Sequence, residues 1–519
     1  MAIHTYTDTL TGQLRRFETT DKVWVQLATP TGELLQELPP EALEALEALE
    51  PAETELRGRD SLRLLSQEAV SHLPSTSVGV AGRHVVDEDG DDRIFLDREL
   101  LLEVKQPMGD PTEDFAQVGV TMVRDHFDPG VYTVRLPEEE TFAQGIDRLF
   151  DTGLFRWVVP NEAIRSPRDA ARLSPAKQEL LTDRLHLPDT VPPPPGAGES
   201  PLRLELPSST PNPDHDILNL PFLWMGIREA WQQVWPEIVP GEGTIVGIVD
   251  EAVSSQHNDL RVLPNPSLLA PAPVMALDHH GTEMAGLVAA QRNSFGILGI
   301  APGTGLLSVG ADFMQTQGAE VVMSLGNILD ALAFAMHWLV RNGHRRVVMN
   351  FSWTTKDPNP MLEKRICALA DQGYLLVAAA GNNGDDGVNP VSLDKSPRYP
   401  AVYREVLTVG AREIAFNGQD KVCGPRLSNS NFGSRVDLAA PGEGFVTTTR
   451  EGDAFFTTGE TSAATASVSG IAALLWSAAP TKTAAEIRQA LLETARPPGG
   501  EGLGRGCVHA LDALNFLRR

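Results

Sequence analysis

The sequence predicts an α/β protein whose larger part is a doubly wound, mostly parallel sheet. From about residue 214 onward, mostly apolar runs of strand length alternate with helical segments, the clearest runs being 244–249, 346–350 and 375–379. Strands that are apolar along their whole length are buried on both faces, which is typical of a parallel sheet covered by helices. In such sheets functional side chains gather at the carboxyl ends of the strands. Asp250 and Asn382 lie at two of these ends, and each of His280 and Ser462 starts a predicted helix.

The composition is that of a globular protein with an acidic surface. The 519 residues carry 69 Asp and Glu against 43 Lys and Arg, which gives a formal net charge of -26. Such a surface repels polyanions, so we expect neither nucleic acid nor an anionic membrane as a partner. The length predicts three or four domains rather than one core.

The chain start and the cysteines bear on where the protein resides. Residues 1–6 show no basic segment followed by an apolar core, and no apolar run is long enough to span a bilayer. Cytoplasmic localisation is therefore the default expectation, and secretion without a classical signal stays open. Cys367, Cys423 and Cys507 are an odd number without metal-ligand spacing, so no disulfide framework is expected.

Composition divides the chain into four segments: an N-terminal accessory module at 1–95, a small α+β domain at 96–165, a Pro-rich linker at 166–213 and the α/β domain at 214–519. In the second segment, the order strand, helix, strand, strand, helix, strand predicts a ferredoxin-like unit. The linker contains a run of prolines at 192–195 and is typical of an exposed, semi-rigid and protease-sensitive connection. The first segment combines strand-like pieces with a helical repeat at 42–49, and we assign it no function.

Ser462 has the sequence context of a nucleophile. A turn rich in hydroxyl groups at 457–461 leads into a run of small and apolar residues at 463–476. A serine at such a helix start lies among unpaired backbone N–H groups that can stabilise an oxyanion, and it needs only a base to become a nucleophile. The alternative is a serine that merely caps a core helix.

Four local motifs surround the four polar residues. They are VGIVD at 246–250, HGTEMAG at 280–286, AAGNNG at 379–384 and TSAA at 461–464, with GIAP at 299–302 and GLGRG at 502–506 as further matches. In this order the motifs resemble those of the subtilisin-like serine peptidases, the subtilases, over roughly residues 212–519. The resemblance implies a subtilisin-like fold and a serine endopeptidase that is made as a precursor. A lipase motif G-x-S-x-G and a zinc peptidase motif H-E-x-x-H are both absent from the sequence.

The chemistry of the four residues agrees with that resemblance. His280 can take the proton of Ser462 and return it to the leaving amine, and Asp250 would orient the imidazole. Asn382 would donate its side-chain N–H to the oxyanion of the tetrahedral intermediate. These four are the predicted catalytic residues.

The sequence departs from the family pattern at several positions near these residues. Glu251 precedes an alanine where a small residue and a glycine are usual, and Glu283 stands where a second histidine is common. Glu460 replaces a glycine and Ala466 replaces a proline. The last two changes motivate an alternative function: a weak or inactive pseudopeptidase that binds a peptide or a partner.

Substrate-binding residues follow in part from the resemblance. Ser352 and Trp353 lie on a segment similar to the edge strand to which subtilases add an extended substrate as a further strand. Gly381 leaves room for the substrate backbone, and Asp394 lies in an acidic loop that predicts a basic residue before the scissile bond. A solvated acidic loop without a role in binding is the alternative for Asp394.

Calcium is the one cofactor that the resemblance implies. Residues 291–297 are similar to the calcium loop of the family, and Asp259 corresponds to its carboxylate ligand. Asp259 and Asn293 supply the oxygen ligands that a hard cation prefers. Arg292 replaces a neutral residue of the loop.

The partners implied by the resemblance are a protein or peptide substrate and the chain's own domain at 96–165. That domain is similar to subtilase propeptides in its strand order and in its ending WVVPN at 157–161. The resemblance implies an intramolecular chaperone and inhibitor that is released when the linker is cut. A permanent domain that presents substrates is the competing interpretation.

Overall fold

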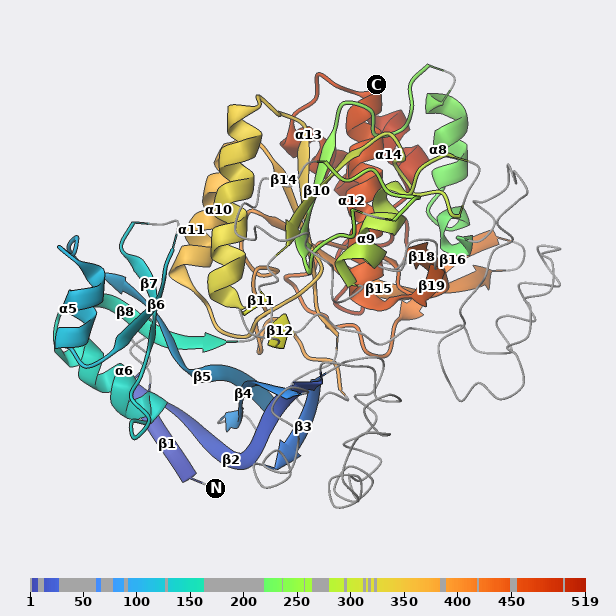
Figure 1. Ribbon diagram of the computed structural model, residues 1–519. Helices are drawn as coiled ribbons and strands as arrows, with labels where there is room; N and C mark the ends of the chain where they lie inside the picture. Colours follow the sequence, from blue (N-terminus) through green and yellow to red (C-terminus); the bar gives the residue numbers. More distant parts are fainter. Residues whose placement is uncertain are drawn as a thin grey trace. The chain divides into compact units, whose positions relative to one another are not determined.

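The structure is a computed structural model (Figure 1), and the part of the chain that it describes consists of residues 2–7, 14–27, 62–66, 78–87, 92–126, 129–162, 219–235, 237–255, 257–263, 280–293, 296–310, 314–315, 319–321, 324–382, 389–417, 420–448, 455–497 and 500–519. The chain forms two compact units. The first consists of Met1–Ile164 and Ala311–Ala333, and the second of Arg165–Gly310 and Phe334–Arg519. The predicted linker at 166–213 and the helical repeat at 42–49 lie outside the described residues.

The first unit is built on one eight-stranded sheet among the described residues. Strand β5 is paired with β4, β7 and β8, so the N-terminal strands and the following domain share the sheet. β5 also runs across the predicted boundary at 95/96. The N-terminal strands are β1 (Ala2–Thr7), β2 (Leu14–Leu27), β3 (Leu62–Ser66) and β4 (Val78–Asp87).

The ferredoxin-like order predicted for the second segment is confirmed. The elements are β5 (Asp92–Val104), α5 (Pro111–Gln117), β6 (Thr121–Asp125), β7 (Val131–Arg135), α6 (Phe142–Asp151) and β8 (Phe155–Glu162). Helix α6 begins at a capping box between Thr141 and Gln144, and it buries Ile146 and Leu149 against the sheet. The alternation of apolar positions therefore gave the correct elements, because each buries one face in a shared core.

The second unit contains the predicted parallel sheet. Its strands are β9 (Ile245–Asp250), β10 (Gly305–Gly310), β13 (Val347–Phe351), β14 (Leu375–Ala379), β15 (Val406–Asn417), β16 (Asp420–Arg426) and β17 (Leu438–Pro441). The order is β10-β9-β13-β14-β15-β16, β17 also pairs with β15, and only β16 is antiparallel. Strands β9, β13 and β14 are buried at every position, as expected for a sheet covered on both faces.

Helices cover both faces of this sheet (Figure 1), which makes it doubly wound. Helices α9 (His280–Ala289) and α12 (Glu460–Ala478) pack against each other on one face, and α11 (Pro360–Asp371) lies on the other. Helix α10 (Leu325–Arg341) is divided between the two units, and it belongs to this one from Phe334 onward. The other elements of this unit are β18 (Phe445–Thr448), β19 (Phe455–Thr458), η2 (Leu220–Leu223), α8 (Ile227–Val234), α13 (Ala484–Glu493) and α14 (Ala510–Leu517). Strands β11 (Met314–Gln315) and β12 (Ala319–Val321) belong to the first unit. Within the described residues, each helix is too short or too polar to span a bilayer.

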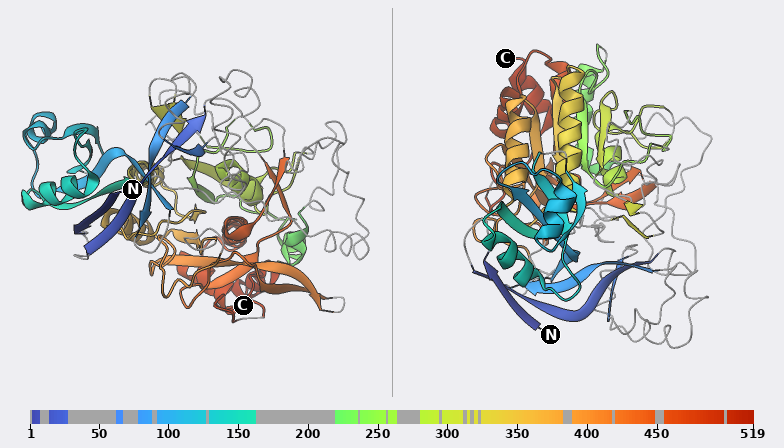
Figure 2. Two further views of the ribbon diagram at one scale, coloured as in Figure 1. Left: turned by 90° about the horizontal axis from the view of Figure 1, so that it is seen from below. Right: turned by 60° about the vertical axis from the view of Figure 1, so that its left-hand side comes forward.

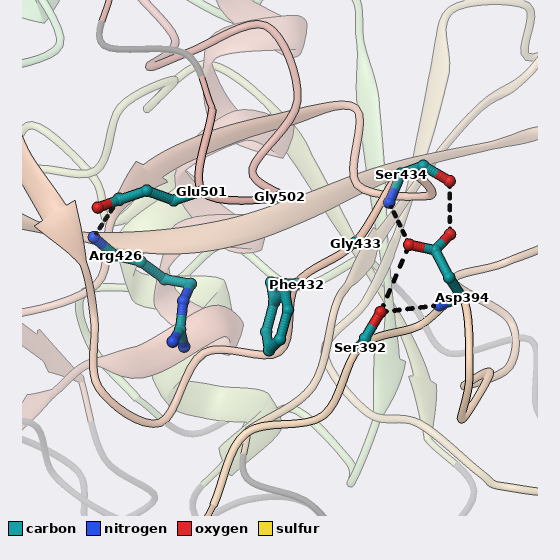
Figure 3. A pocket seen from close by; sticks show the side chains of 8 residues that line it. All are labelled: Ser392, Asp394, Arg426, Phe432, Gly433, Ser434, Glu501 and Gly502. Atoms are coloured by element: carbon teal, nitrogen blue, oxygen red, sulfur yellow. Dashed lines mark hydrogen bonds between the residues drawn. The ribbon is translucent and has the colours of Figure 1, made fainter.

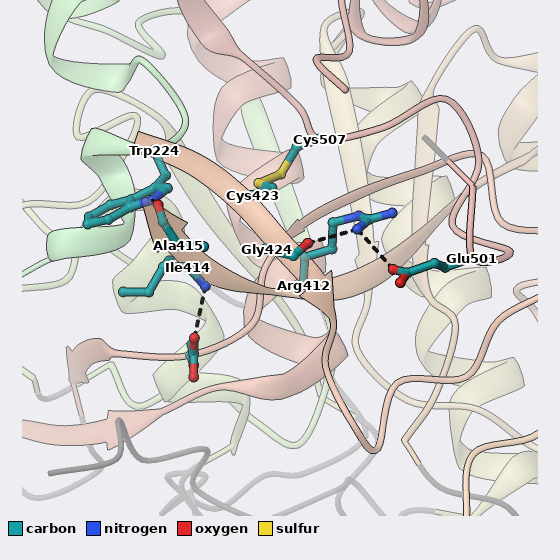
Figure 4. Close-up of a disulfide and its surroundings, with 9 residues drawn as sticks. Trp224, Arg412, Ile414, Ala415, Cys423, Gly424, Glu501 and Cys507 are labelled. Atoms are coloured by element: carbon teal, nitrogen blue, oxygen red, sulfur yellow. Dashed lines mark hydrogen bonds and ion pairs between the residues drawn. A yellow bond between two sulfur atoms is a disulfide. The ribbon is translucent and has the colours of Figure 1, made fainter. Parts of the chain in front are cut away.

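A disulfide corrects the expectation drawn from the cysteine count. Strands β15 and β16 form a long ribbon (Figure 2), and Cys423 of β16 is bonded to Cys507 near the C-terminus. Beside the disulfide, the buried Arg412 donates hydrogen bonds to Gly424 O at 2.8 Å and to Glu501 at 3.1 Å (Figure 4). An odd cysteine count does not prevent one pair from forming, and Cys367 is the cysteine left free.

Candidate active site

Asp250 and His280 are in direct contact. Asp250 is the last residue of β9 and is fully buried, and His280 is the first residue of α9. The Nδ1 atom of His280 lies 2.9 Å from both carboxylate oxygens of Asp250. A Cβ atom on Gly281 would lie 2.0 Å from the carbonyl oxygen of Glu251, so only glycine lets α9 start this close to the end of β9.

The other ring nitrogen of His280 has no hydrogen-bond partner. Nε2 is buried and unpaired among the described residues. Burial alone lowers the pKa of His280, but Asp250, and after it Glu283 and Glu251, outweigh burial and raise the pKa to about 9. The ring is therefore held by one nitrogen and has the other available for a proton.

Ser462 lies in the first turn of α12 among small residues. Its Oγ donates a hydrogen bond to Ser352 O at 3.1 Å, and the hydroxyl of Ser352 donates to Ser462 O at 3.3 Å. The side chain of Ser462 is almost completely buried. α12 packs against α9, so the helix that carries Ser462 in its first turn is a neighbour of the helix that starts with His280.

Asn382 is fixed by the residue that precedes Ser462. It follows β14 after Gly381, whose φ of 90° is in the region that favours glycine. Its Oδ1 accepts hydrogen bonds from the backbone N–H of Thr461 at 3.0 Å and from the Thr461 hydroxyl at 2.7 Å. Its Nδ2 is buried without a partner among the described residues. The two bonds to Oδ1 fix the orientation of the amide group, and Nδ2 remains as its available donor.

Glu460 and Ala466, the two positions nearest to Ser462 that differ from the family pattern, are accommodated in different ways. Glu460 has a φ of 64°, a conformation that costs a non-glycine residue about 1 to 3 kcal/mol. Its buried side chain accepts a hydrogen bond from Asn429 Nδ2. Ala466 is buried inside α12, where the chain remains helical. The turn that holds Ser462 therefore forms without the glycine and the proline of the family pattern.

The predicted substrate-binding residues lie in three different settings. The edge strand expected at Ser352 is wrong for β13, which is paired with β9 on one side and with β14 on the other. Ser352 follows the end of β13, where this pairing stops, and contacts Ser462 as described. Trp353 is fully buried and its Nε1 donates to Val249 O at 2.9 Å, so its backbone rather than its indole is the part available to a peptide. Gly381 precedes Asn382 directly.

Asp394 lies away from these contacts, in a pocket of about 670 Å³ (Figure 3). Its carboxylate accepts hydrogen bonds from the backbone N–H of Ser434 at 2.8 Å and from the Ser434 hydroxyl at 2.5 Å, which lower its pKa. Arg426, stacked over the ring of Phe432, lines the same pocket. None of the four predicted catalytic residues lines it.

Asp259 is a buried carboxylate with one oxygen that is hydrogen-bonded and one that is available to a cation. It is fully buried, and its Oδ2 accepts from the backbone N–H of Ile297 at 2.9 Å. Its Oδ1 has no hydrogen-bond partner among the described residues, and burial raises its pKa to about 7. Nδ2 of Asn293, in the segment after α9, donates a hydrogen bond to Asn258 O at 3.3 Å, in the segment after β9 that contains Asp259. The described residues contain no group of three or more His, Cys, Asp or Glu that would hold a metal. The oxygen donors nevertheless fit calcium in type.

The fold is a doubly wound sheet, Asp250 is paired with His280, and Ser462 lies on the helix that packs against α9; these are the side-chain types that a serine hydrolase uses. The model of the subtilase family matches residues 241–509. The chain therefore belongs to the subtilase family, and it is a subtilisin-like serine endopeptidase.

Individual relatives agree with this classification. The chain is 34% identical over 281 residues to the thermostable alkaline protease of Halalkalibacterium halodurans, an alignment that covers 54% of this chain and 70% of the relative. It is 32% identical over 272 residues to subtilisin BL of Lederbergia lenta, covering 52% and 90%. Among solved structures, fervidolysin from Fervidobacterium pennivorans, a keratinolytic enzyme related to subtilisin, has a similar fold. The TM-score is 0.56 at 22% identity, and the match covers 82% of this chain and 62% of fervidolysin.

Proposed function

We propose that the chain hydrolyses peptide bonds with Ser462 as nucleophile and His280 as general base. The observation that carries the proposal is the pair of buried nitrogens without partners, Nε2 of His280 and Nδ2 of Asn382. A buried polar group without a hydrogen bond is costly, and a peptide bound at Ser462 would supply a partner to each of the two nitrogens.

In the proposed reaction the same groups act in both steps, formation of the acyl enzyme and its hydrolysis. Ser462 Oγ attacks the scissile carbonyl carbon while its proton passes to Nε2 of His280. Nδ2 of Asn382 donates to the oxyanion, and Asp250 stabilises the imidazolium. The C–N bond then breaks, and the amine leaves with the proton from His280. Water repeats the sequence on the acyl enzyme and releases the carboxylic acid.

We also propose that the domain at 96–165 acts as a propeptide that restrains the peptidase until the linker at 166–213 is cut. The ferredoxin-like strand order of that domain supports this role. Substrates would add as a strand along the backbone at Ser352 and Trp353, with Gly381 leaving room for them. A preference for a basic residue before the scissile bond stays a prediction, because Asp394 is bound to Ser434 in a separate pocket.

One mass-spectrometric experiment tests both proposals. Purified full-length chain is incubated, treated with a fluorophosphonate and compared with Ser462→Ala. We expect wild type to carry one adduct on Ser462 and to be cut between residues 161 and 214, whereas Ser462→Ala shows neither. Ser467→Ala is the matched control, because its buried Oγ lies on the same helix and has no hydrogen-bond partner among the described residues. This control should behave as wild type.

The possible results separate the proposals. A wild-type chain that is folded but neither labelled nor cut would support the pseudopeptidase alternative suggested by Glu460 and Ala466. Labelling without cleavage would reject self-processing and leave the role of Ser462 intact. Cleavage of Ser462→Ala at the wild-type rate would show that another protease cuts the linker.

We propose that Asp259 and Asn293 hold a calcium ion that stabilises the peptidase domain. The buried, unpaired Oδ1 of Asp259 supports this site. We expect saturating Ca²⁺ to raise the free energy of unfolding by about 2.7 kcal/mol at one hundred times Kd, and chelation to reverse the gain. Thermal unfolding with Ca²⁺ and with chelator measures the effect. In Asp259→Asn the difference should vanish, whereas in Asp371→Asn, an exposed control, it should persist. An equal response in both variants would place any calcium elsewhere.

The location of the protein also remains a proposal. Cytoplasmic residence was the default expectation from the sequence. The Cys423–Cys507 disulfide instead favours an oxidising compartment, because such bonds rarely persist among cytosolic thiols.

A further inference from the structure

Glu460 and Asn429 form a buried contact beside the turn that holds Ser462. The side chain of Glu460 is in a residue that is only 4% exposed, and its Oε1 accepts a hydrogen bond from Nδ2 of Asn429. A carboxylate is seldom buried unless it is hydrogen-bonded or functional. The two residues are 31 positions apart in the chain, so the contact joins two separate segments of the peptidase domain.

The segment 429–431 is fixed to the end of β14. Ser430 forms an antiparallel bridge with Asn382. The backbone N–H of Asn431 donates a hydrogen bond to Gly381 O at 2.9 Å. Ser430 and Asn431 are almost completely buried. Any displacement of this segment therefore moves the backbone of Asn382 as well.

Glu460 is fixed on the side of the nucleophile. Its backbone N–H donates a hydrogen bond to Gly442 O at 2.5 Å. The next residue, Thr461, donates two hydrogen bonds to Oδ1 of Asn382, and Ser462 follows in the first turn of α12. The orientation of the Glu460 peptide thus sets the direction in which Thr461 and Ser462 enter the helix.

These contacts close a ring of covalent and hydrogen-bonded links around the candidate site. The ring runs through the carboxylate of Glu460, the side chain of Asn429, Ser430, Asn382 and Thr461, and it returns to Glu460 along the backbone. In a buried ring, each hydrogen bond limits the movement of the groups that the others hold. Removal of the contact between Glu460 and Asn429 opens the ring, so that Thr461 and Asn382 gain freedom to move.

We infer that Glu460 and Asn429 are positioning residues that hold the oxyanion donor Asn382 in place relative to Ser462. The inference rests on the proposed roles of Asn382 and Ser462 in peptide hydrolysis. An oxyanion donor acts only when it is aimed at the place where the charge develops, and a displacement of about 1 Å can lower the rate by about a hundredfold. Glycine, the residue of the family pattern at position 460, would adopt the φ of 64° without strain, but it has no side chain to reach Asn429.

Steady-state kinetics of variants at positions 460 and 429 test the inference. The amount of active enzyme is first measured by labelling Ser462 to completion with a fluorophosphonate, so that chains that fail to fold are not counted. We expect Glu460→Gly and Asn429→Ala each to lower kcat about tenfold with KM nearly unchanged, because the peptide still binds but the oxyanion donor is misplaced. Glu460→Gln keeps an oxygen that can accept from Asn429, so it should retain most of the wild-type kcat. Glu237→Gln, an exposed control, should behave as wild type.

The double variant shows whether the two side chains act through their contact. If they do, Glu460→Gly combined with Asn429→Ala should lower kcat no further than either single change. Losses that multiply to about a hundredfold would show that the residues act independently, and would overturn the inference. A kcat in Glu460→Gly equal to or above the wild-type value would also overturn it, because glycine would then serve as well as glutamate.

Thermal unfolding of the same variants separates positioning from stability alone. Glycine relieves the backbone at position 460, which offsets the lost hydrogen bond, so Glu460→Gly should unfold within a few degrees of wild type although its kcat is lower. If kcat were lost only at temperatures at which the variant unfolds, the residue would be structural and the inference would be wrong.

The labelling step also separates this inference from the catalytic proposal. A folded wild-type chain that is neither labelled nor active would reject the proposed function, and the inference with it. A wild-type chain that is labelled and active, with an unchanged kcat in Glu460→Gly and Asn429→Ala, would reject the inference alone.

Discussion

Replacing Asn382 by leucine is expected to lower kcat by about 10²- to 10³-fold with little change in KM. One oxyanion donor contributes roughly 3 to 4 kcal/mol of transition-state stabilisation, and it contributes little to binding of the ground state. In this structure Nδ2 is the buried donor without a partner, and Oδ1 is held by Thr461. Steady-state kinetics on a peptide substrate at alkaline pH measure the loss.

Two variants distinguish a lost donor from a disturbed turn. Thr461→Val removes the hydroxyl that bonds Oδ1 but keeps Nδ2, so it should cost less than Asn382→Leu. Asn342→Leu, on the surface after α10, should leave kcat unchanged. If Asn382→Leu raised KM and kept kcat, the side chain would bind substrate rather than stabilise the oxyanion.

Loss of the Cys423–Cys507 disulfide is expected to destabilise the peptidase domain by up to about 4 to 5 kcal/mol. The bond closes a loop with a sequence separation of 84 residues, and loop entropy for such a length predicts that size. The variant with both cysteines replaced by serine should unfold at a clearly lower urea concentration than wild type.

Reduction of the wild-type protein should have the same effect, and Cys367→Ser, which removes only the free cysteine, should have none. Equal midpoints for oxidised and reduced wild type would show that the bond does not form in solution or that the unfolded chain remains compact without it. Mass analysis after thiol alkylation separates these two cases.

Local patterns in the sequence were sufficient for the fold class. The apolar runs that end at Asp250 and before Asn382 are strands of one parallel sheet, and His280 and Ser462 lie at helix starts. The order of elements from β5 to β8 was also predicted correctly. These features depend on residues that are adjacent in the chain, so periodicity and motif spacing reveal them.

The sequence by itself thus determined the elements, their order and the family to which the chain belongs. Only the tertiary structure decided which groups are close to each other: Cys423 pairs with Cys507, Glu251 accepts a hydrogen bond from the backbone N–H of His280, and Asp394 accepts hydrogen bonds from Ser434. It also decided that the indole of Trp353 is buried. The physical reason is that burial, pairing and pKa depend on segments brought together by packing, and no local pattern records how far apart those segments lie in space.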